Sequence, residues 1–238
     1  MARITLSAPA FADFGVTEPG EIITLGWAAP GEELVLPALG WRFPRGTREQ
    51  HWRNYTVRRH DPARAEVEID FALHDDPGQA TRWAAEAKPG DRAGFAGPRT
   101  HWKDDPGADW ALLVADDTGV PAALAILESL PAGQPAIALL EVADEHERQL
   151  IATAADVEVR WLSRDGRPPG STTLLADAVR AVDLPPGRGR VWGAGESRAM
   201  RRVRDHLRRG RGLAKEAVNV LGYWAVRRSS NGTSSSSA

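Results

Sequence analysis

Residues 104–115 read DDPGADWALLVA, and the change of pattern inside this stretch decides the predicted fold. The first six residues are polar and rich in turn formers, which is typical of a linker. The next six, Trp110 to Ala115, form a near-continuous apolar run, as expected for a strand buried on both faces of a parallel sheet. The stretch therefore separates two halves of the chain that we expect to fold differently.

Downstream of this linker, short apolar segments alternate with segments of helical pattern. Such alternation predicts an open parallel sheet covered by helices, an α/β nucleotide-binding domain over residues 110–226. The expected strands span residues 110–115, 136–142, 157–162, 191–194 and 218–223. The expected helices span residues 121–130, 145–154, 172–182 and 197–209.

Upstream of the linker, residues 1–103 contain short segments rich in β-branched and aromatic residues, separated by Pro-Gly turns. Val67, Ile69, Phe71 and Leu73 recur at a period of two, which indicates a strand with one buried face. Many short strands with turn signals between them predict an antiparallel β-barrel. The expected strands span residues 3–6, 22–25, 34–36, 54–57, 67–73 and 92–95.

The composition of the 238 residues excludes several classes of protein. The chain contains no cysteine, so disulfide scaffolds, thiolate zinc sites and iron–sulfur clusters are excluded, and redox chemistry would need a bound cofactor. A net charge of −2 gives no general attraction to nucleic acid or to an anionic membrane. We find no signal peptide and no membrane-spanning stretch, and therefore expect a cytoplasmic protein. Residues 227–238 are of low complexity and are expected to be a disordered tail.

Two clusters in the β half carry residue types that suit a flavin nucleotide. Arg53 and Tyr55 are expected on one face of a strand, with Thr56 on the other. An arginine can bind pyrophosphate bidentately, and a tyrosine ring can stack on a flat heterocycle. In the second cluster, Gly78 would allow close approach of the backbone, and Thr81 is expected to cap a helix whose N-terminus suits phosphate. Each cluster alone also fits an ordinary structural role.

Together the clusters match R-x-Y-[ST] and G-x-x-[ST], the paired flavin motifs of the ferredoxin–NADP reductase superfamily. The surrounding sequence resembles more narrowly the siderophore-interacting protein family, the ferric-siderophore reductases. The family usually has proline and glycine where this chain has Gln79 and Ala115. The segments that carry the resemblance are 52–58 (WRNYTVR), 69–74 (IDFALH), 81–84 (TRWA), 89–91 (PGD), 97–98 (GP), 115–122 (ADDTGVPA), 191–196 (VWGAGE) and 222–224 (GYW).

The resemblance implies FAD as cofactor and NADPH or NADH as electron donor. Arg53 and the 78–81 turn would contact the pyrophosphate, Tyr55 would stack on the isoalloxazine ring, and Thr56 would lie near its reactive nitrogen. The full set of expected cofactor contacts is Arg53, Tyr55, Thr56, Val57, Asp70, Leu73, His74, Gly78, Ala80, Thr81, Trp83, Asp117, Thr118, Ser163, Arg164, Gly195, Glu196, Arg198, Tyr223 and Trp224.

The choice between NADPH and NADH depends on residues that follow the third strand of the α/β half. Ser163 and Arg164 could hold the 2′-phosphate of NADPH, because an arginine fork fits phosphate. The neighbouring strand end is acidic, which opposes a phosphate. We predict NADPH. The acidic residues are Glu141, Asp144, Glu145 and Glu147.

The substrate implied by the resemblance is a ferric siderophore. Hydride would pass from NAD(P)H to FAD, and single electrons would then reduce Fe³⁺ to Fe²⁺, which siderophores hold less tightly. We expect a monomer with no resident metal site. The basic residues that could attract an anionic chelate are Arg42, Arg45, Arg48, His51, Arg99 and His101.

Two alternative functions stay open. One is a flavin reductase that serves a protein acceptor such as a ferredoxin. The other is a carrier that binds a ferric siderophore without reducing it, although the nicotinamide-side segments 115–122 and 191–196 argue against a carrier.

Overall fold

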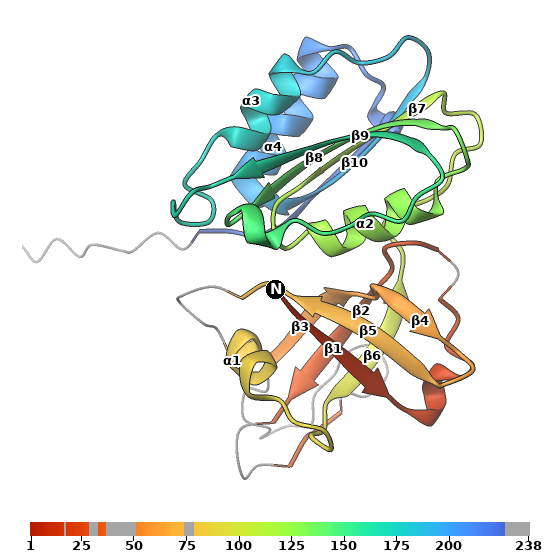
Figure 1. Cartoon of the computed structure of the whole chain (residues 1–238), viewed down its shortest axis with the longest axis vertical. Coiled ribbons are helices and arrows are strands. Elements are labelled where there is room, and N and C mark those ends of the chain that lie inside the picture. Colours follow the sequence, from red (N-terminus) through yellow and green to blue (C-terminus); the bar gives the residue numbers. More distant parts are fainter. Residues whose placement is uncertain (17, 29–32, 37–50, 74–78, 227–238) are drawn as a thin grey trace, which may run out of the picture.

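The computed structural model describes residues 1–16, 18–28, 33–36, 51–73 and 79–226 (Figure 1). A β-domain forms the lower body in this view, and an α/β domain forms the upper body. The predicted fold class, an antiparallel β-domain followed by a parallel α/β domain, is confirmed.

The β-domain contains six described strands and one α-helix, α1. The strands pair antiparallel into two three-stranded sheets, ordered β1-β5-β4 and β3-β2-β6. In the part of the chain that the structure describes, these remain two sheets and do not pair into a closed ring. The elements are β1 (Ala2–Ser7), β2 (Ile22–Trp27), β3 (His51–Thr56), β4 (Arg59–Asp61), β5 (Glu66–Phe71), α1 (Gln79–Glu86) and β6 (Gly94–Arg99), with a 3₁₀ turn at Pro9–Phe11.

The core of the β-domain follows the alternation seen in the sequence. Val67, Ile69 and Phe71 of β5 are fully buried and pack with apolar residues of β2. Aromatic rings complete this core, and Trp83 of α1 lies 5.0 Å from Trp27, centroid to centroid. Burial of these large apolar side chains is the main stabilising term of the domain.

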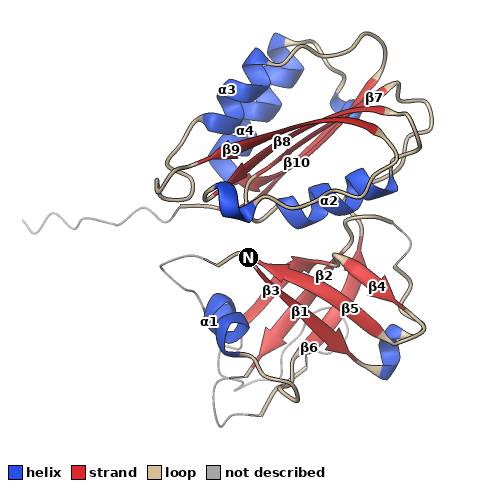
Figure 2. Cartoon of the chain, in the orientation of Figure 1, coloured by secondary structure: helices blue, strands red, loops and turns tan. Residues whose placement is uncertain are grey.

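The α/β domain contains one five-stranded, fully parallel sheet in the order β11-β10-β7-β8-β9. Helix α2 covers one face, and α3 and α4 cover the other (Figure 2). The elements are β7 (Trp110–Ala115), α2 (Val120–Ser129), β8 (Pro135–Val142), β9 (Asp156–Ser163), α3 (Leu174–Ala181), β10 (Gly189–Glu196), α4 (Ser197–Asp205) and β11 (Val218–Trp224), with short helical turns at Glu145–Glu147, His206–Gly210 and Lys215–Ala217.

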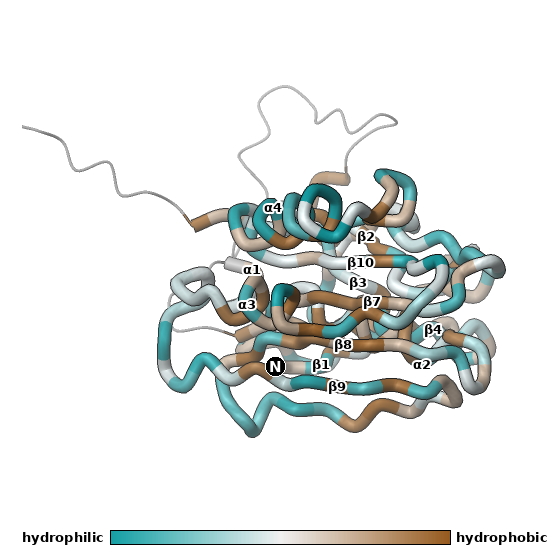
Figure 3. Tube along the Cα trace, turned by 90° about the horizontal axis from the view of Figure 1, so that it is seen from above, coloured by the Kyte–Doolittle hydropathy of each residue, from teal (hydrophilic) through white to brown (hydrophobic). Residues whose placement is uncertain are grey.

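Strand β7 shows why the decisive stretch is apolar on both faces. Ala111, Leu113 and Ala115 pack under α2, whereas Trp110, Leu112 and Val114 pack under α3 and α4. Figure 3 shows the hydrophobic strands of this sheet beside the largely hydrophilic α4. The position of β7 at the centre of the sheet therefore fixes its composition.

Two predictions of secondary structure were wrong, and one strand was missed. Residues 34–36 form no strand, and the helix expected over residues 145–154 is only a 3₁₀ turn at Glu145–Glu147. Leu150 in that segment is 98% exposed, so a helix there would gain no buried apolar face. The sequence analysis also missed β4, a three-residue strand of polar composition.

Both domains contribute to the contact between them. Arg58 of the β-domain is buried and donates to both carboxylate oxygens of Glu128 in α2, at 2.7 and 2.5 Å. Asn219 of β11 donates to the carbonyl of His101, just after β6. Within the described residues, no helix has the length and apolar character that crossing a membrane requires.

Candidate functional site

A cavity of about 600 Å³ lies between the two domains. Its lining comes from strands β2, β3, β5 and β11, helix α1 and the turn after β7, so it gathers segments that are far apart in the sequence. The residues that line it are Ile22, Trp52, Arg53, Asn54, Tyr55, Asp70, Ala72, Ala80, Thr81, His101, Asp117, Thr118, Leu221, Gly222, Tyr223 and Trp224.

A larger cavity of about 780 Å³ lies wholly within the β-domain, between β1 and residues 87–93. Of the expected cofactor contacts, only Trp83 lines it. The interdomain cavity, by contrast, contains nine of them, so we regard it as the candidate site. Those nine are Arg53, Tyr55, Asp70, Ala80, Thr81, Asp117, Thr118, Tyr223 and Trp224.

Tyr55 and Arg53 of β3 both line the cavity, as their spacing of two predicts. The ring of Tyr55 lies 4.4 Å from that of Phe71 and 6.0 Å from that of Trp27, which fixes its orientation. Burial raises the pKa of Tyr55 to about 12, so its phenol stays neutral at physiological pH. Arg53 is exposed and donates to the carbonyl of Trp52 at 2.9 Å. This wall thus presents a fixed neutral ring beside a cation.

Of the other flavin contacts expected in the β-domain, some line the cavity and some do not. Thr56 and Val57 are buried, and neither lines the cavity. Asp70 of β5 does line it, and its carboxylate accepts two hydrogen bonds from Arg3, at 2.6 and 2.8 Å. Leu73 is exposed outside the cavity.

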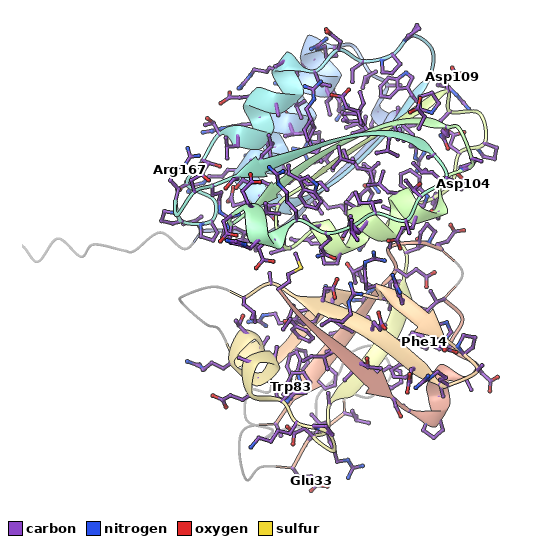
Figure 4. The ribbon with its side chains drawn as sticks, viewed as in Figure 1. Phe14, Glu33, Trp83, Asp104, Asp109 and Arg167 are labelled. Carbon is purple, nitrogen blue, oxygen red and sulfur yellow. The ribbon has the colours of Figure 1, made fainter. Side chains whose placement is uncertain are left out.

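Helix α1 contributes Ala80 and Thr81 to the cavity. The helix begins at Gln79, so Thr81 lies inside its first turn and the prediction that Thr81 is the N-cap was wrong. The first-turn N–H groups of a helix have no partner within the helix, and they suit an anion. Trp83 points into the domain core instead of the cavity (Figure 4). His74 and Gly78 lie outside the described residues.

The turn after β7 holds two adjacent carboxylates in different surroundings. Asp116 is buried and accepts hydrogen bonds from three segments of the α/β domain, at Thr118, Glu196 and Trp224. Asp117 lines the cavity and pairs with Arg164 at 2.5 Å. The sequence analysis missed Asp116; its place directly after a buried strand, at the carboxyl edge of the sheet, is the signal that could have found it.

Arg164 is only 3% exposed and lies between two carboxylates. Its guanidinium is 2.5 Å from Asp117 and 3.6 Å from Glu141. Burial raises the pKa of both Asp117 and Glu141, against the opposing effect of Arg164. The hydroxyl of Ser163 donates to the carboxylate of Asp165. The Ser-Arg pair on which the NADPH prediction rested is therefore already engaged within the protein.

Glu196 ends β10 and caps α4. One carboxylate oxygen, Oε2, accepts from the backbone N–H groups of Arg198 and Ala199 at 2.7 and 2.9 Å. The other, Oε1, is buried without a hydrogen-bond partner. Gly195 precedes it, and a Cβ there would lie 2.7 Å from Cγ of Asp116. The need for glycine at this position thus arises from the approach of Asp116.

Tyr223 and Trp224 form the cavity wall at the end of β11. The hydroxyl of Tyr223 is buried and has no hydrogen-bond partner, and burial raises the pKa of this phenol. The carbonyl of Trp224 accepts from Ser197 at 2.7 Å. A buried hydroxyl without a partner is costly unless a ligand satisfies it, so this wall fits a bound group with polar edge atoms.

The basic residues expected to attract a chelate are distributed differently. Arg42, Arg45 and Arg48 lie outside the described residues, and of His51 only the backbone, in β3, is described. Arg99 donates to Thr24 and Asn54 at 2.7 and 2.8 Å and so ties β6 to β2 and β3. His101 lines the cavity, and burial together with Arg99 lowers its pKa.

The cavity fits a flavin nucleotide chemically. Tyr55 supplies a flat neutral ring, Arg53 and the first turn of α1 supply groups for a pyrophosphate, and the buried Tyr223 hydroxyl lacks a partner. Among the described residues, no group of three or more histidine and acidic side chains is placed to hold a metal ion.

Two family models match consecutive parts of the chain. Residues 1–102 match the siderophore-interacting FAD-binding domain, and residues 108–227 match the siderophore-interacting protein model.

Two relatives support the same family assignment. An uncharacterized protein of Mycobacterium tuberculosis, Rv2895c, is 36% identical over 181 residues, covering 72% of this chain and 64% of the relative. The ferric vibriobactin reductase ViuB of Vibrio cholerae is 30% identical over 174 residues, with the same coverage. The match therefore spans less than two thirds of the length of these relatives.

Solved structures share the whole architecture. A siderophore utilization protein from T. fusca has a TM-score of 0.84 and 34% identity, covering 95% of this chain and 87% of that one. The siderophore-interacting protein SipS from Aeromonas hydrophila has a TM-score of 0.76 and 28% identity, covering 94% and 91%. A ferredoxin NADP⁺ reductase from Neisseria gonorrhoeae, at 14% identity and a TM-score of 0.64, shares the fold.

Proposed function

This chain belongs to the siderophore-interacting protein family, and we propose that it is an FAD-dependent reductase that uses NADH or NADPH to reduce the Fe³⁺ of a ferric siderophore. The observation that carries the proposal is the interdomain cavity. It joins a flavin-type wall, with Arg53, Tyr55 and the start of α1, to a second wall formed by Thr118 and Tyr223–Trp224. Relatives named ferric vibriobactin reductase and ferric acinetobactin reductase support the substrate class.

In this proposal, residues 1–103 form the FAD-binding domain and residues 110–226 the nicotinamide-binding domain. Arg53 and the first turn of α1 hold the pyrophosphate, because both present N–H donors to the cavity. Tyr55 orients the isoalloxazine by contact with its face. FAD, when bound, accepts a hydride and gives up electrons singly, which connects a two-electron donor to one-electron iron chemistry.

The α/β wall positions the electron donor. Asp117 and Thr118 stand at the carboxyl end of β7, where parallel sheets bind ligands. Arg164 neutralises Asp117, so the carboxylate is not left as an isolated charge in a partly buried site. Because Arg164 is engaged in ion pairs with Asp117 and Glu141, it gives no reason to prefer NADPH over NADH. Either nucleotide is therefore proposed as the electron donor.

Release of iron needs no acid–base residue from the protein. Fe²⁺ attracts hard anionic oxygen ligands less strongly than Fe³⁺, so reduction weakens the complex. The role of this chain is to align donor, cofactor and chelate and to keep water from the buried part of the cavity.

The test is an anaerobic visible spectrum of the FAD-loaded protein, to which NADH or NADPH and then a ferric siderophore with a ferrous trap are added. Bleaching of the flavin, followed by its reoxidation and by trapped Fe²⁺, is the expected result. Bleaching without trapped iron would favour a protein acceptor. A protein that binds the chelate but is not bleached by either nucleotide would be a carrier, and the proposal would fail.

A further inference from the structure

We propose that Asp116 is a positioning residue, which fixes Trp224 as a rigid part of the cavity wall without contacting the cavity itself. This inference rests on the proposed function for its effect on the reaction. Asp116 is 6% exposed and does not line the cavity, whereas Trp224 and Thr118 do.

The carboxylate of Asp116 accepts four hydrogen bonds. Oδ1 accepts from the backbone N–H of Thr118 at 2.9 Å and from its hydroxyl at 2.6 Å. Oδ2 accepts from the backbone N–H of Glu196 at 2.7 Å and from the indole Nε1–H of Trp224 at 2.8 Å. An ionised carboxylate has about four acceptor positions, so these donors saturate it.

The four donors belong to three segments that the chain order keeps apart. Thr118 stands in the turn before α2, Glu196 stands before α4, and Trp224 ends β11. These segments meet at the carboxyl edge of the sheet, and two of them form the α/β wall of the cavity. Asp116 is therefore the common acceptor that holds this wall together.

Trp224 is held from two sides. Its indole donates to Asp116, and its carbonyl accepts from the hydroxyl of Ser197. The neighbouring glycines allow this close packing, because a Cβ at Gly195 would approach Asp116 Cγ to 2.7 Å and a Cβ at Gly222 would approach Ser197 Oγ to 2.5 Å. A residue held at its backbone and at its side chain presents one face to a ligand.

Alanine at position 116 would break this arrangement, because it removes both carboxylate oxygens and leaves all four donors without their acceptor. Asparagine would not serve, because its amide oxygen can face Glu196 and Trp224 while the Thr118 hydroxyl turns to accept from its NH₂. In D116A we therefore expect the indole N–H of Trp224 to lose its partner. The wall that the α/β domain contributes to the cavity would become less rigid. The flavin contacts of Arg53 and Tyr55 belong to the β-domain and would persist.

The matched control is D109A. Asp109 lies directly before β7, and Asp116 lies directly after it (Figure 4). The carboxylate of Asp109 accepts a hydrogen bond from the backbone N–H of Arg188 at 2.7 Å. The substitution removes the same charge and one backbone contact at the opposite end of the same strand, away from the cavity.

The experiment compares wild type, D116A and D109A by ¹H–¹⁵N spectroscopy and by kinetics of the FAD-loaded protein. The indole signal of Trp224 is identified by its absence in W224F. It should be hydrogen-bonded and slow to exchange in wild type and D109A, and should shift and exchange rapidly in D116A. The KM for the nicotinamide donor should rise about tenfold in D116A, with FAD affinity nearly unchanged.

Other results would overturn the inference. These are an unchanged Trp224 indole signal in D116A, or a donor KM that changes no more than in D109A. Should D116A not fold, W224F tests the same contact, because it replaces the indole and its Nε1–H donor by a phenyl ring; an unchanged donor KM would then refute the role. If neither nucleotide reduces the wild-type flavin, the proposed function fails, while the indole signal still decides whether Asp116 holds Trp224.

Discussion

Replacing Arg164 with methionine distinguishes a structural cation from a ligand of the NADPH 2′-phosphate. The guanidinium lies 2.5 Å from Asp117 and 3.6 Å from Glu141 and is almost fully buried. R164M keeps most of the apolar stem but leaves two carboxylates without their cation. Removing one partner of a buried ion pair costs about 3–5 kcal/mol of unfolding free energy. For a chain of 238 residues, that corresponds to a fall in Tm of roughly 6–20 °C.

The loss of unfolding free energy in R164M should depend on pH. Burial already raises the pKa of Asp117 and Glu141 in the folded protein, and removing Arg164 takes away a charge that opposes this rise. A carboxyl group with a raised folded pKa binds its proton more tightly when folded. Stability is then greatest below the unfolded pKa, about 4, and falls as pH rises through the folded pKa. We expect the difference between wild type and R164M to be large at pH 7 and to narrow as the pH approaches 4.

The assay is thermal unfolding with FAD in equal excess at pH 4.5 and pH 7, together with KM for NADH and for NADPH. Arg160, on β9 just before Arg164, supplies the control, because it pairs with Glu158 at 2.6 Å on the surface and R160M should cost less than about 1 kcal/mol. If R164M kept wild-type stability but raised KM for NADPH alone, Arg164 would be a phosphate ligand and the reasoning would be refuted.

Three further predictions test the two walls and the domain contact. Y55A should weaken FAD binding about 10- to 100-fold in a fluorescence titration, because the ring loses about 1.5–3 kcal/mol of apolar contact, whereas Y55F should bind nearly as wild type. G195A should lower the unfolding free energy in urea by about 1–3 kcal/mol, because its methyl group would lie 2.7 Å from Asp116 Cγ; undiminished stability would mean that the glycine serves only a ligand. E128A should lower the Tm by leaving Arg58 buried without its bidentate partner, a cost of about 3 kcal/mol, and an unchanged Tm would mean that this contact does not stabilise the domain junction.

The fold was largely predictable because burial leaves a direct record in the sequence. A strand buried on both faces, such as β7, must be apolar throughout, and β5 must be apolar at every second residue where one face is buried. The segment after β8 was wrongly predicted because Glu145 to Ala154 contains good helix formers, yet Leu150 is exposed and adds no buried apolar area. Propensity alone seldom holds a short helix.

The candidate site was predictable in position but not in the roles of its residues. Arg53 and Tyr55 stand two apart on one strand, so their common face can be inferred from local geometry. The engagement of Arg164 by Asp117 joins residues 47 positions apart in the numbering, and no local spacing indicates it. Sequence analysis therefore identified a cation suited to phosphate, and only the tertiary structure reveals its carboxylate partners.

The adjacent pair Asp116 and Asp117 makes the same point at the smallest scale. The two side chains are chemically identical, but the chain leaves β7 in a turn that directs one inward and the other to the cavity. Asp116 meets only donors and therefore organises the wall, whereas Asp117 meets Arg164 and the cavity. Because a carboxylate takes its role from the groups that surround it, exchanging the two environments would exchange the roles. Hence D116A should loosen Trp224 while D117A, which leaves all four donors to Asp116 in place, should not.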